Sequence, residues 1–422
     1  MDFDITTLAH RCRYSTDCSA TGVNNNQIVV GGSGSGKTMS ITEPCLLNTQ
    51  HRNLIVTVTK PRIIHKYAPL LASRGYRVDT VNFAQPEQSP YAFDPLCFIR
   101  SDQDITFLAR SIVLANPRKQ EDNKADPYWD EVATSLMSAL IAGVLLRNPG
   151  AGFDEVLAMF QNLQVHYGDT ISTNYDTFYN GLHPCSRGKF AVTNWKSFCN
   201  LPSRTAACVV SSLGVTIGHL FGGGIMQMMR NPHKVDFRTL AQEKSVLFVV
   251  SSPVNPGLNS FISLFYATAM KELFEFAEER PDGALPIPTH MVCDDFATGA
   301  PIPHFDQYIS IIREKALSVT LLCQSESQLE SLYGKAGATT IINNCDSYVY
   351  TGAMDLSTAK NVGLRLNAPV DEVLSMPLGT FAVFRRGNPP VITQRYPILE
   401  DPLYQQVTQA QMYCRQEQES CR

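Results

Sequence analysis

The stretch QIVVGGSGSGKT, residues 27–38, decides the fold of this chain. Its first part, Gln27 to Val30, predicts a short buried strand, and the residues from Thr38 to about Leu47 predict a helix. Between them, Gly31 to Thr38 match G-x-x-x-x-G-K-[ST] at every defined position. A strand that leads through such a loop into a helix is the context that separates a phosphate-binding P-loop from a chance turn rich in Gly and Ser.

The residues of this loop suit a nucleoside triphosphate. The glycines let successive backbone N–H groups turn inward around phosphate oxygens. The Lys37 ammonium would pair with the β- and γ-phosphates, and the Thr38 hydroxyl is a ligand for Mg²⁺. The sequence therefore predicts that ATP binds with Mg²⁺ in a cradle made by Gly31, Gly32, Ser33, Gly34, Ser35, Gly36, Lys37 and Thr38.

A P-loop needs an acidic partner on another strand, and THMVCDDFATG, residues 289–299, is the best candidate. Asp294 and Asp295 end an apolar strand, at the edge where ligands bind in parallel α/β sheets. We expect Asp294 to hold the metal through its water shell and Asp295 to orient or deprotonate the attacking water. The alternative is an ordinary Asp-Asp turn after a short strand.

Two further polar residues complete the predicted catalytic set. Gln324 ends the strand SVTLLCQS, residues 318–325, where its amide would sense the γ-phosphate or hold the attacking water. Arg313 ends the intervening helix, and arginines that neutralise transition-state charge are supplied by a neighbouring subunit in some NTPases. The alternative for Arg313 is a solvated helix-end arginine, which the helix dipole favours.

Strand and helix alternate on both sides of a helical stretch, which predicts a parallel sheet covered on both faces. The predicted fold is α/β with a mostly parallel sheet and an inserted all-helical domain. The expected strands are 27–30, 54–58, 76–83, 246–250, 291–293, 318–323 and 348–350, with a late edge strand at 381–384. The predicted division is an N-terminal tail (1–23), a nucleotide-binding domain in two parts (24–101 and 204–400), the inserted domain (102–203) and a C-terminal tail (401–422).

Composition narrows the setting in which the chain works. The net charge of −4 provides no overall attraction to nucleic acid, so DNA contact requires a local basic strip or a pore. The twelve cysteines include no CxxC pair, which favours reduced thiols in a cytoplasmic protein. No secretory signal is visible. The longest apolar stretch, Leu136 to Leu146, is shorter than the roughly 20 residues that span a bilayer.

Taken together, these motifs resemble the type IV coupling proteins, the TraG/TraD-type ATPases of bacterial conjugation and type IV secretion. The resemblance covers about Asn24 to Arg386. It is carried by NNNQIVVGGSGSGKT, RNLIVTVTKPR, RGYRVDTVNF, DPYWDEVATSLMSALIAGVLL and SRTAACVVSSLG, by the long stretch from CDDFATG to ESLYG, and by NNCDSYVYTGAMDLSTAK.

The resemblance implies a RecA-like P-loop NTPase core that assembles as a homo-hexamer around a central channel. It implies ATP-driven delivery of relaxase-bound single-stranded DNA to a type IV secretion channel, with the inserted domain helping to recognise the cargo. By the same resemblance, Lys37, Thr38 and Asp294 hold nucleotide and metal. Asp295 takes the catalytic acid position, Gln324 the sensor position, and Arg313 that of the arginine acting on a neighbouring subunit.

Three departures from the family pattern matter. Relatives usually have Asp-Glu where this chain has Asp294-Asp295, and a carboxylate one methylene shorter places water less well. The family's Asp-Pro-Lys-Gly appears here as Val58-Thr59-Lys60-Pro61, which keeps the lysine and loses the aspartate. Relatives also commonly carry an N-terminal membrane anchor, which the two dozen residues before the first predicted strand do not resemble. We therefore expect a separate membrane-anchored partner that docks this ATPase at the inner face of the cell membrane; the alternative is a variant that works in soluble form.

Two other functions fit the same residues. The Asp294-Asp295 pair also suits a nucleotide-gated adaptor that recruits cargo with little hydrolysis. The core alone suits a DNA translocase of the FtsK/HerA group, although the helical insertion disfavours that assignment.

Overall fold

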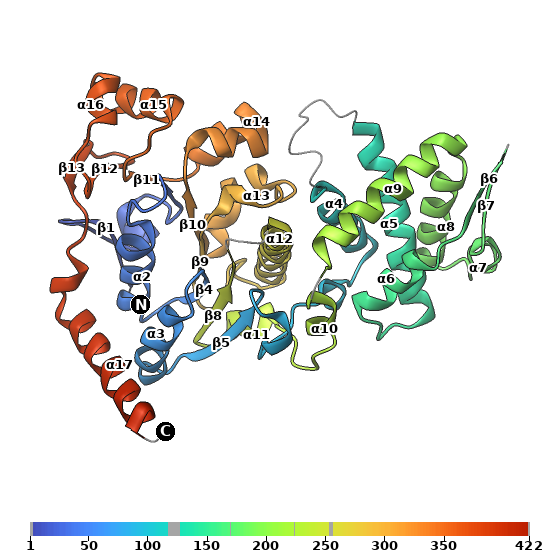
Figure 1. Cartoon of the computed structure of the whole chain (residues 1–422), viewed down its shortest axis with the longest axis horizontal. Helices are drawn as coiled ribbons and strands as arrows, with labels where there is room; N and C mark the ends of the chain where they lie inside the picture. The colour runs from blue at the N-terminus through green and yellow to red at the C-terminus, as the bar shows by residue number, and fades with distance from the viewer. Residues whose placement is uncertain (1–2, 117–126, 169, 223, 253–255, 421–422) are drawn as a thin grey trace.

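The computed structural model describes residues 3–116, 127–168, 170–222, 224–252 and 256–420. Its centre is a nine-stranded sheet with the order β13-β12-β11-β3-β10-β9-β4-β8-β5 (Figure 1). All strands from β11 to β5 in this order are parallel, whereas β12 and β13 run antiparallel at one edge. The strands are β3 (Gln27–Val30), β4 (Asn53–Val58), β5 (Arg77–Asn82), β8 (Ser245–Val250), β9 (Thr289–Cys293), β10 (Leu317–Cys323), β11 (Ser347–Tyr350), β12 (Thr380–Arg385) and β13 (Val391–Gln394).

The central strands are apolar because both faces of the sheet are covered. Every residue of β3, β4, β8 and β9 is buried. Successive side chains point to opposite faces of a strand, so Val29 packs with one core while Ile28 and Val30 pack with the other. The helices α2 (Glu43–Asn48) and α3 (Arg62–Ser73) contribute to the first core, and α12 (Pro256–Glu278) contributes to the second.

The helical block lies to one side of the sheet, beyond α12 (Figure 1). It is not entirely helical, because the short hairpin β6 (Val165–Tyr167) and β7 (Ile171–Thr173) interrupts it. These strands are too short and too exposed to produce a period-2 pattern. The helices of the block are α4 (Asp102–Leu114), α5 (Pro127–Arg147), α6 (Phe153–Gln161), α7 (Asp176–Asn180), α8 (Ser186–Cys199) and α9 (Ser203–Leu220).

Helix α9 joins the block to the core. It begins at Ser203, where the sequence predicts the return to the nucleotide-binding domain, and it packs against α4 and α5 as well as α12. The helical packing therefore extends past the predicted limit at residue 203. The short helices α10 (Ile225–Met229) and α11 (Phe237–Gln242) then lead into β8.

One helix in the described residues, over 128–147, is long and apolar enough to cross a membrane. Its most apolar window has a mean hydropathy of 1.4, and 72% of that window is buried. It packs against α4 and α8, as the central helix of a folded bundle does.

The expected N-terminal tail is wrong as a description. Residues 5–15 form the hairpin β1 (Ile5–Ala9) and β2 (Cys12–Ser15), followed by α1 (Cys18–Thr21). Leu8 and Ala9 are fully buried, and the His10 N–H donates to the Gln394 carbonyl at 2.9 Å. The hairpin therefore contacts β13, which contains Gln394. No local sequence pattern indicates a contact between residues so far apart in the chain.

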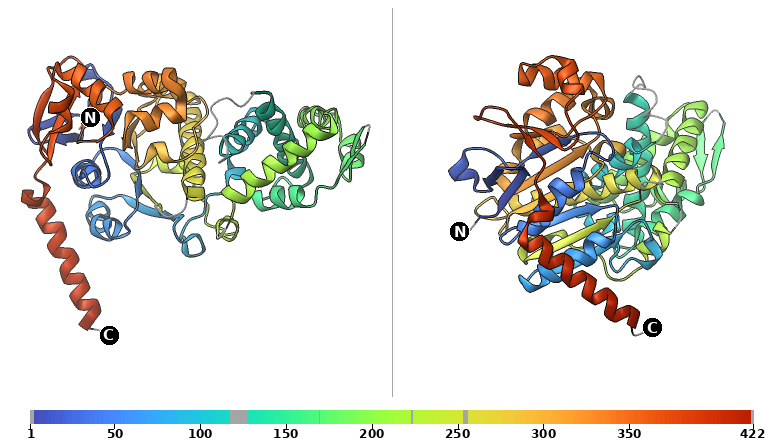
Figure 2. Two further views of the ribbon diagram at one scale, coloured as in Figure 1. Left: turned by 45° about the horizontal axis from the view of Figure 1, so that its top comes forward. Right: turned by 60° about the vertical axis from the view of Figure 1, so that its left-hand side comes forward.

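The C-terminal part differs from expectation at one strand. The predicted edge strand at 381–384 is β12, but β13 lies outside it and forms the edge. The residues of β13 are mostly exposed, so they lack the apolar alternation by which a strand is found. Beyond it, α17 (Pro402–Ser420) leaves the sheet and runs past α3 (Figures 1 and 2). The remaining described α-helices are α13 (Phe305–Ile311), α14 (Glu326–Asn343), α15 (Leu356–Leu366) and α16 (Val370–Leu374).

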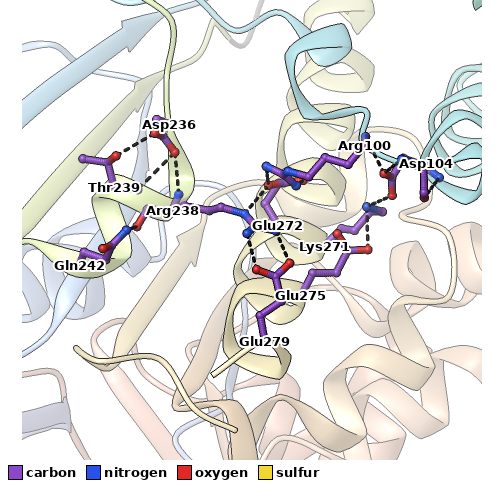
Figure 3. A network of polar contacts seen from close by, with 11 residues as sticks. Arg100, Asp104, Asp236, Arg238, Thr239, Gln242, Lys271, Glu272, Glu275 and Glu279 are labelled. Atoms are coloured by element: carbon purple, nitrogen blue, oxygen red, sulfur yellow. Dashed lines mark hydrogen bonds and ion pairs between the residues drawn. The ribbon is translucent and has the colours of Figure 1, made fainter. Parts of the chain in front are cut away.

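A network of charged side chains ties α12 to the two segments that connect the sheet with the helical block (Figure 3). The buried Glu272 carboxylate accepts two hydrogen bonds of 2.7 Å from Arg100, which precedes α4. Arg238, in α11, lies 3.4 Å from the same carboxylate. One residue earlier on α12, Lys271 pairs with Asp104 in the first turn of α4. The segment that enters the helical block and the segment that returns from it therefore both form ion pairs with α12.

Candidate functional site

The loop after β3 takes the shape that its glycines permit. Gly34 and Gly36 have positive φ angles of 78° and 87°, a region that other residues seldom adopt. Behind the loop, the expected helix begins with a π-helical turn, Thr38–Thr42, before α2. A side chain at Gly31 would not fit, because its Cβ would lie 1.8 Å from the Thr351 hydroxyl.

Neighbouring strands hold the loop from both sides. The Gly31 N–H donates to the Cys323 carbonyl at the end of β10, at 3.1 Å. On the other side, the Gly32 N–H donates to the Gly352 carbonyl at 2.8 Å, just beyond β11. The hydroxyls of Ser35 and Thr351 also lie 2.8 Å apart. The cradle is therefore fixed to three adjacent parallel strands.

Lys37 lies inside this cradle. Its ammonium donates to the carbonyls of Gly31 at 2.5 Å and Gly32 at 3.1 Å. Burial lowers the pKa of Lys37, and the nearby carboxyls of Asp294 and Asp295 act in the opposite direction. The geometry sets one cation at the centre of a loop of backbone donors, which is the arrangement that binds a polyphosphate.

Asp294 stands opposite the loop, at the end of β9. The Thr38 hydroxyl donates to its Oδ2 at 3.4 Å. Burial raises the pKa of Asp294 to about 6, and the adjacent Asp295 adds to the rise. A hydroxyl and a carboxylate side by side are hard oxygen donors that fit Mg²⁺, which takes its other ligands from phosphate and water. Within the described residues no cluster of three or more His, Cys, Asp or Glu offers a metal site of another kind.

Asp295 has an unusual backbone. Its φ of 49° and ψ of 39° lie in the left-handed region, and its N–H donates to Asp294 Oδ1 at 3.1 Å. Both carboxylates line a cavity of about 20 Å³, which has room for one water molecule. Hydroxyl side chains, among them Thr57, Ser263 and Tyr266, form part of its wall. The acidic pair therefore borders a polar chamber of the size of a single water.

The other two predicted residues lie at opposite ends of β10. This strand runs between β3 and β9, so Gln324, directly after it, stands at the same edge as the P-loop and Asp294. Arg313 precedes the strand and lies at the far edge, where it donates to the carbonyls of Cys18 at 3.2 Å and Gly22 at 3.5 Å. The fold thus brings Lys37, Thr38, Asp294, Asp295 and Gln324 together and leaves Arg313 away from the loop of its own chain.

The sequence did not point to three residues that the structure adds to the site. Thr351 and Gly352 brace the loop from the end of β11, as described above. Arg395, directly after β13, has its guanidinium beside Gly36. Thr351 and Gly352 lie inside a stretch that resembles the family, NNCDSYVYTGAMDLSTAK, but no motif gives any of the three residues a role, because each reaches the loop only through the order of the strands.

Known proteins of similar structure are available for comparison. The plasmid coupling protein TrwB in complex with the GTP analogue GDPNP has 17% sequence identity and a TM-score of 0.67, over 88% of this chain and 85% of TrwB. TrwB with an ATP analogue has 17% identity and a TM-score of 0.65, over 90% and 87%. VirB4 of Thermoanaerobacter pseudethanolicus has 13% identity and a TM-score of 0.54, over 88% and 89%. No curated protein sequence matches the chain.

The fold and the family are therefore established. The likeness to TrwB confirms the expected RecA-like α/β fold. The family model described as "Type IV secretory system Conjugative DNA transfer" matches residues 8–367, which is most of the chain. This protein belongs to the family of conjugative DNA transfer proteins of type IV secretory systems.

Proposed function

We propose that this protein is an ATP-dependent coupling protein that drives single-stranded DNA with its bound relaxase, or a protein substrate, into a type IV secretion channel. One observation carries the proposal: in a chain of this family, a complete P-loop meets an acidic strand end through the contact between Thr38 and Asp294. TrwB, of similar fold, has been determined with ADP and Mg²⁺.

Each residue of the site has a role in ATP hydrolysis. The N–H groups of the loop and the Lys37 ammonium would hold the phosphates, and Thr38 and Asp294 would hold Mg²⁺. The chemistry that Mg²⁺ would supply there is neutralisation of phosphate charge. Asp295 orients the attacking water and accepts its proton. Gln324, one strand closer to the P-loop, senses whether the γ-phosphate is present.

In the proposed assembly, Arg313 reaches the nucleotide from a neighbouring subunit. Within one chain this residue lies at the edge of the sheet opposite to the P-loop, and its side chain donates only to backbone carbonyls among the described residues. A homo-hexameric ring would direct Arg313 of one subunit at the nucleotide of the next, where it neutralises charge in the transition state. The ring would surround the transported strand.

The partners follow from this role. They are the relaxase with its single-stranded DNA, the components of the secretion channel, and a membrane-anchored protein that holds the ring at the inner face of the membrane. The net charge of −4 supports DNA contact through a local lining of the channel rather than the whole surface.

ATP turnover with single-stranded DNA, with duplex DNA and without DNA tests the proposal. We expect single-stranded DNA to stimulate hydrolysis and Lys37→Ala to abolish it, because the loop loses its cation. A wild-type protein that hydrolyses no ATP in any of the three conditions would contradict the motor. Stronger stimulation by duplex DNA would favour a translocase of the FtsK/HerA group.

The second candidate is a nucleotide-gated adaptor, which Asp295 favours because its carboxylate has a shorter reach than the usual glutamate. This function predicts tight ATP binding with negligible turnover. It also predicts that Asp295→Glu raises hydrolysis by moving the carboxylate closer to the water. Unchanged or lower turnover in that variant would count against the adaptor.

A further inference from the structure

The C-terminal hairpin of the sheet extends to the edge that carries the P-loop. Val30, Tyr350, Ala382 and Ile392 lie in one row across β3, β11, β12 and β13. Strand β13 runs in the same direction as β3, because two antiparallel pairings separate it from the parallel strand β11. Arg395, three residues past that row, therefore emerges on the side of the sheet where β3 continues into the loop.

The side chain of Arg395 reaches the loop itself. A Cβ on Gly36 would lie 3.7 Å from Arg395 Nη1, so the guanidinium is directly beside the residue that precedes Lys37. The stem of the side chain passes Gly379, where a Cβ would lie 3.8 Å from Cδ and 3.9 Å from Nε. The Arg395 N–H donates to the Gly379 carbonyl at 2.7 Å, which anchors the backbone. Two glycines thus flank the course of one arginine.

The charge of Arg395 has no partner among the described residues, with which its exposed guanidinium forms neither an ion pair nor a hydrogen bond. Other arginines in the same part of the sheet are engaged: Arg386 pairs with Asp346 at 3.4 Å, and Arg385 lies over the Tyr14 ring. A guanidinium presents five N–H donors in a planar fork that matches phosphate oxygens. Beside a loop that binds anions, such a group is complementary to a phosphate chain.

We propose that Arg395 binds the phosphate chain of the nucleotide held in the P-loop of its own subunit. This inference rests on the proposed function, since it requires that the loop binds a nucleotide. Lys37 acts from inside the cradle, and Arg395 closes it from outside as a second cation. The site is therefore built from the P-loop, near the start of the family region, and from the β12–β13 hairpin, which lies beyond its end at residue 367 and supplies the outer wall.

Nucleotide affinity tests the assignment. The dissociation constants of ADP and of a non-hydrolysable ATP analogue are measured with Mg²⁺ for wild type, Arg395→Ala, Arg395→Lys, Lys37→Ala and Arg13→Ala. We expect Arg395→Ala to weaken both ligands about tenfold, as a lost hydrogen bond to a charged group does. Arg395→Lys keeps the charge without the planar fork, so its nucleotide affinity should lie between those of wild type and Arg395→Ala.

Arg13→Ala is the matched control, because it removes another exposed arginine near Tyr396. We expect its affinities to equal those of wild type, which separates direct contact from a general change of charge. If Arg395→Ala also equals wild type while Lys37→Ala loses binding, the role of Arg395 is refuted and the nucleotide site stands. If the wild type binds neither ligand, the proposed function fails and Arg395 fails with it. Thermal melting confirms that each variant is folded.

Discussion

At the scale of the residue, burial changes the pKa of the two charged groups at the centre of the site. Lys37 and Asp294 carry opposite charges in a partly desolvated site. Burial lowers the pKa of Lys37 and raises the pKa of Asp294, so it favours the neutral form of both groups. Bound phosphate and metal would supply the compensating charges. Shifted pKa values of this kind are typical of functional sites.

The raised pKa of Asp294 predicts how nucleotide binding depends on pH. With a pKa of about 6, the carboxyl takes up a proton as the pH falls through 6 and then no longer serves as a metal ligand. We expect Mg²⁺-dependent nucleotide affinity to be constant above pH 7 and to fall about tenfold by pH 5. Calorimetric titration across this range provides the measurement. Asp294→Asn should bind more weakly and lack the step near pH 6; an identical step in that variant would assign it to another group.

Gly31 predicts a second effect at this scale. In Gly31→Ala the new Cβ would meet the Thr351 hydroxyl at 1.8 Å and the Ser35 hydroxyl at 2.9 Å. We expect the free energy of unfolding to fall by about 1–3 kcal/mol, the usual effect of overpacking. The double variant with Thr351→Ala should regain most of this loss in urea unfolding. A double variant no more stable than Gly31→Ala would show that the clash lies elsewhere.

At the scale of the element, α12 connects the chemistry with the helical block. Its first half faces the acidic pair, since Asn259, Ser263 and Tyr266 line the same small cavity as Asp294 and Asp295. Its second half holds Lys271 and Glu272, which are tied to both connections of the block (Figure 3). One continuous helix therefore contacts both the acidic pair and the connections of the block.

The charge network on α12 predicts a large effect on stability. Arg100→Ala removes the two-pronged partner of Glu272, whose side chain is only 1% exposed, and leaves that carboxylate with Arg238 alone. We expect a loss of about 3 kcal/mol in the free energy of unfolding, because a buried charge would lack compensation. Arg77→Ala breaks exposed pairs with Asp79 and Glu243 and should cost less than about 1 kcal/mol in the same denaturant titration. Equal losses would argue against the network as a clamp.

At the scale of the whole molecule, the separation of Arg313 from the P-loop of its own chain predicts complementation between subunits. Lys37→Ala subunits retain Arg313 but bind no nucleotide, whereas Arg313→Ala subunits bind nucleotide without the arginine. We expect each variant alone to be inactive and their mixture to recover measurable ATP turnover. The control mixes Arg313→Ala with the double variant Lys37→Ala/Arg313→Ala, which should stay inactive. If the mixture recovered no ATP turnover, Arg313 would have to act within its own chain.

Much of the sheet was predictable, because a central parallel strand is buried on both faces and is apolar throughout. The strands β3, β4, β8 and β10 lie within a residue of the predicted limits. The hairpin β1–β2 and the edge strand β13 were missed because β2 and β13 are largely not buried and so lack a clear apolar pattern. Each pairs with a strand close by in sequence, but the contact that joins the hairpin to β13, from the His10 N–H to the Gln394 carbonyl, links opposite ends of the chain. The roles assigned to the P-loop residues, including Lys37 and Thr38, and to Asp294, Asp295, Gln324 and Arg313 stay predictions.

The amino-acid sequence by itself determined the P-loop, the acidic strand end and the buried strands, since each depends on residues adjacent in the chain. Only the tertiary structure decided which of these groups meet. The placement of β10 between β3 and β9 puts Gln324 near Asp294 and sends Arg313 to the far edge. The β12–β13 hairpin brings Arg395 to Gly36 across more than 350 residues of chain. Strand order is set by the packing of the whole sheet, so it cannot be predicted from short-range sequence patterns.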